Sequence, residues 1–265
     1  MGSADSTART TDVLDLGDVR IERIREGQGR PIVLLPSLGR GQRDFDPIAP
    51  LLAASGFRVL RPEPRGIGHS RGPEAGVTLK ALAGDIAAVI RAEEAGPAIV
   101  LGHAFGNWVA RNVAVAHPEL VRGVVLAAAA ARVQSPEVRA ALEVCKDTTR
   151  AREDRLAALQ FAFFAPRHDP SDWLEGWSAE ATQVQRVATS ASPREAWWHA
   201  GSAPILDLIA AHDPFRPPAT RRENADEFGG RVSIHIIDGA SHALIPEQPT
   251  AVVAAIEAWS RSLAT

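Results

Sequence analysis

The 265-residue sequence predicts an α/β fold in which helices cover both faces of a mostly parallel central sheet. Three observations predict it. Short runs that are apolar on both faces alternate with helical segments, which is typical of parallel strands buried between helix layers. An apolar content of 45% is enough to fill such a core. Turn residues and candidate reactive side chains follow the strands, where open α/β sheets bind ligands.

The first organised stretch is an antiparallel hairpin. The sequence VLDLGDVRIERIREG, residues 13–27, holds two alternating runs around Gly17-Asp18, which indicates two strands at a sheet edge. Beyond it the pattern predicts buried strands and helices in turn. The strands are expected at 31–35, 57–60, 97–102 and 122–128, and the helices at 46–55, 78–95 and 105–117.

The alternation stops after Ala131 and resumes at residue 203, with strands expected at 203–210 and 231–238 and a last helix at 248–263. Residues 132–202 look helical and contribute no strand, so we expect a helical cap inserted between two parts of one core domain, 1–131 and 203–265. The opening MGSADSTART is interpreted as a frayed tail, part of it a possible cloning remnant.

The composition of the chain limits the kinds of molecule that it is expected to bind. A net charge of −3 and a pI near 6.3 provide no basic field for nucleic acid. The single Cys145 cannot form an internal disulfide, and no apolar run approaches the ~20 residues of a membrane span. We therefore expect a cytoplasmic monomer or homodimer that binds a small apolar molecule, with no nucleic-acid or membrane partner.

The candidate reactive centre is the stretch Gly102-His103-Ala104-Phe105-Gly106, between a predicted strand and a predicted helix. It resembles the nucleophile elbow G-x-S-x-G of the α/β-hydrolase fold, whose glycines leave room for a sharp turn. Ala104 stands where that family carries its nucleophilic serine. Asp213 follows the strand at 203–210 and His242 follows the strand at 231–238, which matches the family's order of nucleophile, acid and histidine. The resemblance covers nearly the whole chain and implies that Asp213 orients His242.

The resemblance also implies an oxyanion hole and a structural turn. The backbone N–H groups of Leu38, in LLPSLGRGQRDFDP, and of Phe105 are the candidate donors. Pro36-Ser37 departs from the family's usual His-Gly step at the first donor. The stretch RPEPRGIGHS resembles another family turn, in which Arg65 and Ser70 are expected to be structural.

Ala104 leaves several functions open. It is either a deliberate replacement of serine that traps a substrate, or the native residue. A native alanine excludes an acyl-enzyme at this position, because a methyl group cannot attack a carbonyl. The His242–Asp213 dyad could still deprotonate water, giving an ester or lactone hydrolase, or deprotonate the substrate directly, as in cofactor-free lyases and oxygenases of this superfamily. A non-catalytic binding protein is the third alternative.

Single candidate residues also have simpler interpretations that involve no catalysis. Asp213 beside a proline could only cap a turn, and His242 could be a surface histidine. Ser37 could be a displaced nucleophile, although a role in the turn after Pro36 is the simpler interpretation.

Aromatic residues are concentrated in the expected cap, and most of them are expected to hold it to the sheet. We predict that a few line an apolar cavity. The candidates for substrate binding are Ser37, Phe164, Trp173 and Trp177. The histidines lack metal-ligand spacing and the glycine turns lack a phosphate-loop lysine, so we expect neither a metal nor a cofactor.

Overall fold

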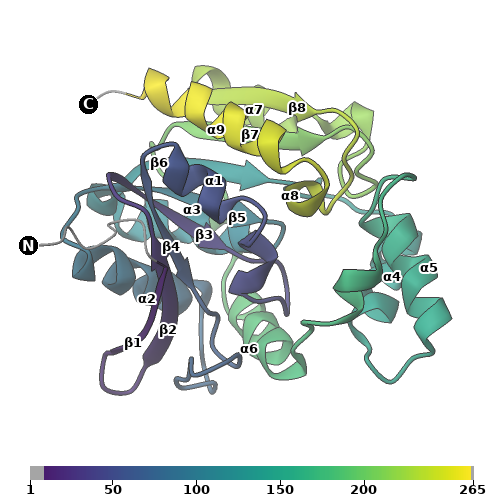
Figure 1. Ribbon diagram of the computed structural model, residues 1–265, viewed down its shortest axis with the longest axis horizontal. Helices are drawn as coiled ribbons and strands as arrows, with labels where there is room; N and C mark the ends of the chain where they lie inside the picture. The colour runs from purple at the N-terminus through teal and green to yellow at the C-terminus, as the bar shows by residue number, and fades with distance from the viewer. Residues whose placement is uncertain (1–8, 264–265) are drawn as a thin grey trace, which may run out of the picture.

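Eight strands form one sheet in the part of the chain that the structure describes, residues 9–263 of a computed structural model (Figure 1). Residues 1–8 of the expected tail MGSADSTART lie outside the described residues, and its last residue, Thr10, begins the first strand, so the tail is shorter than expected. The strands are β1 (Thr10–Asp15), β2 (Arg20–Glu26), β3 (Arg30–Leu35), β4 (Phe57–Pro62), β5 (Ala98–His103), β6 (Val121–Ala127), β7 (Ile205–Ala210) and β8 (Val232–Ile237).

The sheet confirms the predicted fold class. Its strand order is β1-β2-β4-β3-β5-β6-β7-β8, with β1, β2 and β4 paired antiparallel and all later pairs parallel. The predicted hairpin is present at the edge, and Gly17 takes the positive φ (87°) that its turn requires. The carboxyl ends of the parallel strands therefore share one edge of the sheet.

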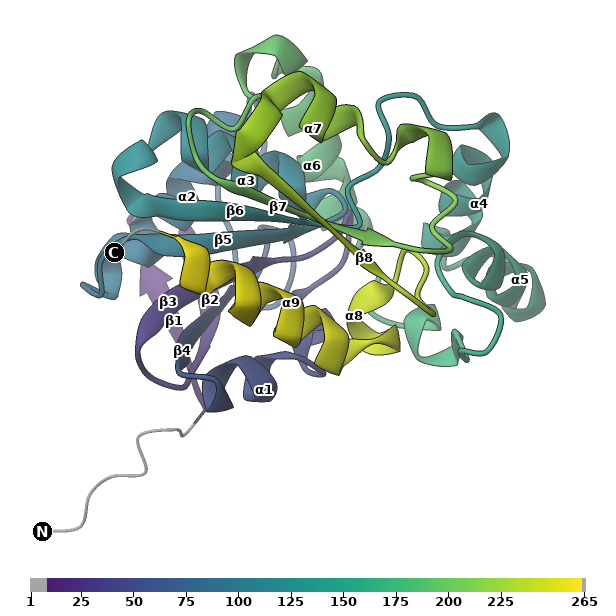
Figure 2. The same ribbon diagram turned by 90° about the horizontal axis from the view of Figure 1, so that it is seen from above.

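Helices cover both faces of the sheet, as Figure 2 shows. On one face lie α2 (Leu79–Ala92) and α3 (Gly106–Ala116), and on the other lie α1 (Ala49–Ala54) and α9 (Pro249–Ser262). The packing of β3 explains why its sequence is apolar from residue 31 to residue 35. Val33 and Leu35 pack into the core beneath α2 and α3, whereas Ile32 and Leu34 pack into the core beneath α1 and α9.

The chain between β6 and β7 is helical in the described structure. It holds α4 (Pro136–Lys146), α5 (Arg152–Ala162) and α6 (Ala179–Ser190), joined by loops and short 3₁₀ turns. Helices α4 and α5 form a lobe beyond one end of the sheet, which we call the α4–α5 lobe (Figures 1 and 2). The side chains of Ser135 and Ser178 cap α4 and α6 by accepting hydrogen bonds from Val138 and Ala181.

Two short helices were not predicted from the sequence. They are α7 (Glu223–Phe228), between β7 and β8, and α8 (Leu244–Glu247), between β8 and α9. Both are too short to show a helical apolar period. Among residues 9–263, no helix is both long enough and apolar enough to cross a membrane.

Candidate functional site

The turn between β5 and α3 is strained at one residue. Ala104 has a φ of +46°, a left-handed conformation that costs roughly 1–2 kcal/mol for a residue with a side chain. Its N–H donates to the carbonyl of Ala127 at 2.9 Å, and its carbonyl accepts from the N–H of Asn107 at 3.1 Å. Hydrogen bonds on both sides therefore hold Ala104 in this conformation.

The two glycines of the pentad are required by close backbone contacts. A Cβ atom on Gly102 would lie 2.2 Å from the nitrogen of Asn107, and one on Gly106 would lie 2.2 Å from the carbonyl oxygen of Leu35. Both contacts involve backbone, which cannot move aside cheaply. The elbow therefore tolerates a side chain at its middle residue but not at either glycine.

His242 and Asp213 lie on the loops after β8 and β7 and are paired. Nδ1 of His242 lies 2.9 Å from Oδ2 of Asp213, and both side chains are buried. The other carboxylate oxygen of Asp213 accepts the N–H of Phe215 at 2.8 Å, and the Phe215 ring stacks on the imidazole with 4.1 Å between centroids. Within the described chain Nε2 of His242 makes no hydrogen bond, so this nitrogen remains available for proton transfer.

His103 supports the loop that carries His242. Its ring is fully buried, and this burial, followed by the nearby charge of His242, lowers the pKa of His103 to about 3. The neutral ring uses Nε2 to donate to the carbonyl of His242 at 2.8 Å. His103 is therefore a structural neighbour of the site.

The two expected oxyanion donors are unpaired in the described chain. No backbone or side-chain acceptor takes the N–H of Leu38 or of Phe105, whereas the adjacent N–H of Gly39 donates to Oε1 of Gln185 at 2.7 Å. Leu38 and Phe105 approach the same cavity from the loop after β3 and from the elbow. Two unpaired N–H groups on one cavity suit an oxygen that develops negative charge.

A cavity of about 370 Å³ joins these groups. The sequence-predicted residues that line it are Ser37, Leu38, Ala104, Phe105 and His242. Asp213 lies behind the imidazole. This volume is within the usual range of small-molecule sites, roughly 300–1,000 Å³.

The structure does not bring three predicted substrate-binding residues to the cavity. Phe164, Trp173 and Trp177 are not among the residues that line it; they pack behind the wall, in the apolar cluster that also holds the lining residues Phe163 and Phe215. The Arg40 guanidinium lies over both tryptophan rings, 4.3 and 4.9 Å from their centroids, and Phe164 packs edge-on against Trp173. These rings therefore attach the chain after β6 to the loop after β3.

Other residues that line the cavity were not predicted from the sequence. Its apolar wall includes Trp108, Leu142, Phe163 and Phe215, and α6 contributes Arg186. Two of these had a usable signal: Trp108 is one helical turn after Ala104, and Phe215 is two residues after Asp213. Phe163 is adjacent to the predicted Phe164.

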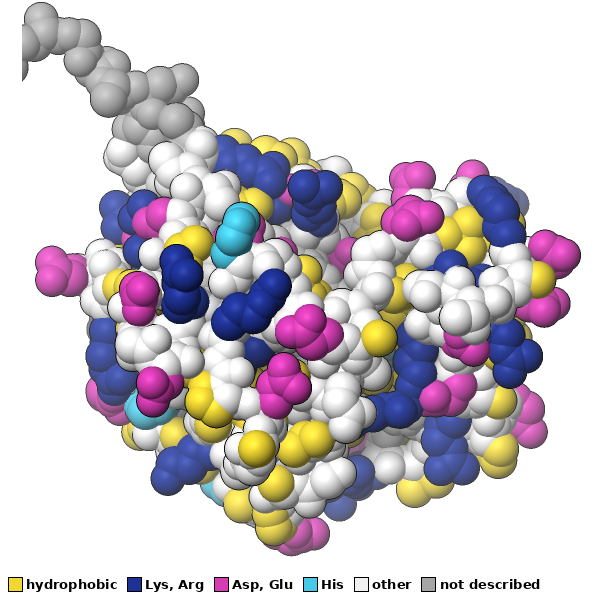
Figure 3. All heavy atoms as spheres, turned by 90° about the horizontal axis from the view of Figure 1, so that it is seen from below, with side chains coloured by type: hydrophobic (Ala, Val, Ile, Leu, Met, Phe, Trp, Pro, Cys, Tyr) yellow, Lys and Arg dark blue, Asp and Glu magenta, His cyan; other side chains and the backbone are white. Residues whose placement is uncertain are grey.

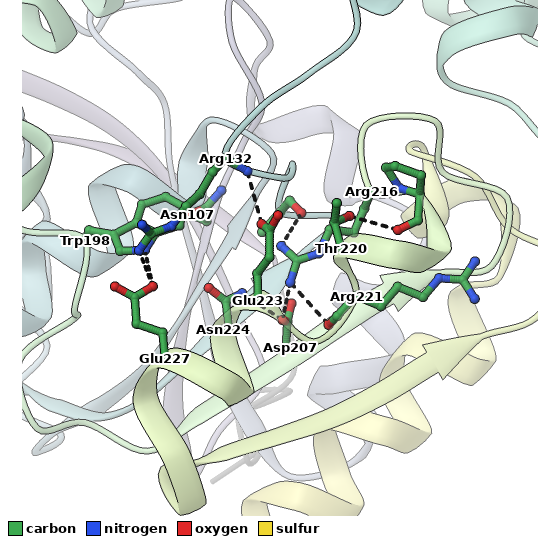
Figure 4. Close-up of polar contacts among 12 residues, drawn as sticks. Asn107, Arg132, Trp198, Asp207, Arg216, Thr220, Arg221, Glu223, Asn224 and Glu227 are labelled. Atoms are coloured by element: carbon green, nitrogen blue, oxygen red, sulfur yellow. Dashed lines mark hydrogen bonds and ion pairs between the residues drawn. The ribbon is translucent and has the colours of Figure 1, made fainter.

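A buried polar chain connects the elbow to the loop of Asp213, as Figure 4 shows in part. Asn107 donates to the carbonyl of Ala104 and accepts from Nε of Arg111 at 3.1 Å. Arg111 donates to Asn224 at 3.0 Å, and Asn224 donates to Asp207 at 2.7 Å.

The series of buried hydrogen bonds continues to the loop that carries Asp213. Asp207 accepts a hydrogen bond from the Arg216 side chain at 3.0 Å, and the backbone N–H of Arg216 donates to the carbonyl of Asp213 at 3.1 Å. Burial raises the pKa of Asp207, an effect that the two arginines oppose. These residues link the positions of Ala104 and Asp213 through the protein interior.

The turn after β4 packs behind the elbow. Arg65 forms two hydrogen bonds of 2.8 Å with Asp85, and the hydroxyl of Ser70 accepts the N–H of Glu22. Glu63 lines a cavity of about 50 Å³ next to the elbow, and burial raises its pKa to about 7. Among the described residues, no three His, Cys, Asp or Glu side chains converge as a metal site requires.

Comparison with known proteins gives one consistent result. The sequence profile described as "Alpha/beta hydrolase family" matches residues 32–256. The Mycobacterium tuberculosis protein named "Putative non-heme bromoperoxidase BpoC" is 28% identical over 242 residues, which cover 85% of this chain and 92% of that protein. The mouse serine hydrolase BPHL is 28% identical over 180 residues, covering 65% of this chain and 61% of the relative.

A solved structure agrees with these sequence matches. The structure of Rv0554 from Mycobacterium tuberculosis superposes with a TM-score of 0.76 at 25% identity, covering 93% of this chain and 95% of the other.

Proposed function

Because the chain belongs to the alpha/beta hydrolase family, we propose that it is an enzyme that hydrolyses an ester-like or lactone-like bond in a small to mid-sized, mainly apolar molecule. His242 is the general base, Asp213 orients it, and the N–H groups of Leu38 and Phe105 stabilise the oxyanion. One observation carries the proposal: the buried His242–Asp213 pair, 2.9 Å apart, faces the same cavity as two unpaired backbone donors.

The methyl group of Ala104 makes water the nucleophile. Nε2 of His242 takes a proton from water while the water oxygen bonds to the substrate carbonyl carbon, and the carbonyl π electrons move onto its oxygen. The two N–H donors stabilise that oxyanion. When the tetrahedral intermediate collapses, the bond to the leaving oxygen breaks and the imidazolium returns its proton to that oxygen. Asp213 accepts the Nδ1–H bond throughout.

The cavity suggests the size and character of the substrate. Phe163, Phe215 and Trp108 give it aromatic walls, and apolar contact with them favours a hydrocarbon or aromatic body. We propose that residues 132–202 act as the cap over the site, since Leu142, Phe163 and Arg186 reach the cavity from this segment.

The test uses aryl and alkyl esters and lactones with acyl chains of two to ten carbons. The unaltered protein should consume part of this series, and His242→Ala should reduce the rate by about 10²–10⁴-fold, the usual contribution of a general base. Asp213→Asn should also reduce it, because the imidazole loses its oriented partner. If His242→Ala leaves consumption unchanged, the proposal is wrong.

Ala104→Ser tests the geometry separately. A serine hydroxyl in the left-handed elbow beside His242 should form an acyl-enzyme, visible as a mass increase on the intact protein after mixing with an activated ester. His242→Ala in the same background should abolish that adduct. Absence of an adduct in a folded Ala104→Ser protein would contradict the placement of the dyad as base for this position.

A second function, ligand binding without turnover, is favoured by Ala104 itself, because a binding protein needs no nucleophile. It predicts saturable binding of the same compounds with no consumption by the unaltered protein. The His242→Ala comparison separates the two functions.

A further inference from the structure

The cavity is electrostatically one-sided. Among the described residues that line it, none is an aspartate or glutamate, while α6 contributes the cation Arg186. The lining also includes apolar side chains, among them Phe163 and Phe215. A ligand with one anionic end and one apolar body would therefore match the cation and the apolar lining.

Arg186 lies at the border between the cavity and an outer groove. It lines both the cavity and a neighbouring depression of about 430 Å³ on α6, and half of its side chain is exposed. In Figure 3, seen from below, the surface is hollowed beside the α4–α5 lobe and Lys and Arg side chains border the hollow. Arg186 can thus contact a ligand whose other end reaches inward.

The present partner of Arg186 is replaceable. Glu143 of α4 accepts from Arg186 at 2.7 Å, but its second oxygen lies 2.5 Å from Nζ of Lys146. Burial raises the pKa of Glu143, yet the hydrogen bonds from Lys146 and Arg186 together lower it overall. If Arg186 turned to a ligand, Lys146 would still compensate the charge of Glu143.

We propose that Arg186 binds a carboxylate of the substrate, so that the enzyme acts on ester-type compounds carrying a free acid group at the end distant from the bond that is cleaved. The inference rests on the proposed function and names its substrate class. A guanidinium matches a carboxylate with two parallel hydrogen bonds. One arginine compensates a singly charged carboxylate better than a doubly charged phosphate.

Binding tests the proposal without requiring turnover. The matched probes are suberic acid mono-N-methylamide and the neutral N-methyloctanamide, because amides are hydrolysed far more slowly than esters. Tryptophan fluorescence, to which Trp108 in the cavity lining contributes, provides the signal, and calorimetry confirms the affinity. We expect the acid to bind about three- to tenfold tighter, since a half-exposed ion pair is worth little more than a surface one. Raising salt from about 50 to 500 mM should shrink the preference.

Four variants sharpen the result. Arg186→Gln should abolish the preference, Arg186→Lys should keep part of it, and Glu143→Gln should increase it by removing the internal competitor. Arg139→Gln, at an exposed site on α4, should leave it unchanged. Equal binding of the two probes by the unaltered protein, or a preference that survives Arg186→Gln, would overturn the proposal. So would tighter binding of a phosphate probe of the same length.

The outcome is separable from that of the proposed function. Ester consumption that depends on His242 but shows no preference for acids would contradict only the role of Arg186. An acid preference that depends on Arg186, together with consumption that ignores His242, would contradict only the hydrolytic mechanism.

Discussion

Glu63 makes the stability of the protein depend on pH in a direction opposite to that of most carboxylates. Its side chain is 7% exposed and accepts the N–H of Gln42 at 2.8 Å. Burial, assisted by the negative charges of Glu22 and Asp44, raises its pKa from 4.5 to about 7. Between these two values the folded protein holds a proton that the unfolded chain releases.

The sign follows from this difference in bound protons. Because the folded state binds more protons than the unfolded state, the free energy of unfolding falls as the pH rises from 4.5 to 7. The whole shift corresponds to about 3 kcal/mol, at 1.36 kcal/mol for each pKa unit. Glu63→Gln keeps an oxygen acceptor for Gln42 and carries no charge at any pH. The variant should therefore gain about 2–3 kcal/mol relative to the unaltered protein between pH 5 and pH 8.

Urea denaturation followed by tryptophan fluorescence at pH 5, 6, 7 and 8 measures the gain. Glu74→Gln is the matched control, because Glu74 is exposed in the same connection between β4 and α2, and its replacement should shift the unfolding free energy equally at every pH. A gap between Glu63→Gln and the unaltered protein that stays constant from pH 5 to pH 8 would refute the reasoning.

Three further predictions concern buried groups. Gly106→Ala should lower the free energy of unfolding by more than about 2 kcal/mol, seen as a lower melting temperature, because the added Cβ would lie 2.2 Å from backbone. Gly84→Ala, in the open middle of α2, should instead raise it by up to about 1 kcal/mol. Asp207→Asn should cost about 3–5 kcal/mol in urea unfolding, since it leaves the buried Arg216 without its counter-ion; a loss below 1 kcal/mol would contradict this. Burial raises the pKa of Cys145 to about 12, so a disulfide reagent should label it only on unfolding, and rapid native labelling would disprove its burial.

The parallel strands of the sheet were predictable because both of their faces are buried. A parallel strand covered on both faces needs a continuous apolar run, as the stretches 31–35 of β3 and 98–101 of β5 show. Loops that follow such strands share one edge, so the order of Ala104, Asp213 and His242 along the chain predicted one site. The structure brings them to one cavity and its rear wall. Their catalytic roles stay a prediction.

The cavity wall was less predictable, because it depends on how a helix ends. Helix α5 stops at Ala162, and the two following phenylalanines differ: both pack against Trp173, but only Phe163 also lines the cavity. Adjacent residues after a helix point in different directions, and the sequence gives no period to choose between them. The buried carboxylate of Asp207 was likewise hidden, because its partners come from α3, α7 and a loop.

Strands β6 and β7 are direct neighbours in the sheet, although the whole α4–α6 segment lies between them in sequence. Because β6 and β7 run parallel, that segment leaves at the carboxyl end of β6 and re-enters at the amino end of β7, at the opposite edge of the sheet. No residue of the segment belongs to a strand, so its length is not tied to the register of the sheet. We therefore expect insertions and deletions in this segment to leave the pairing of β6 with β7 intact, so that α4–α6 can diverge in sequence while the sheet and the loops at its carboxyl edge stay in place.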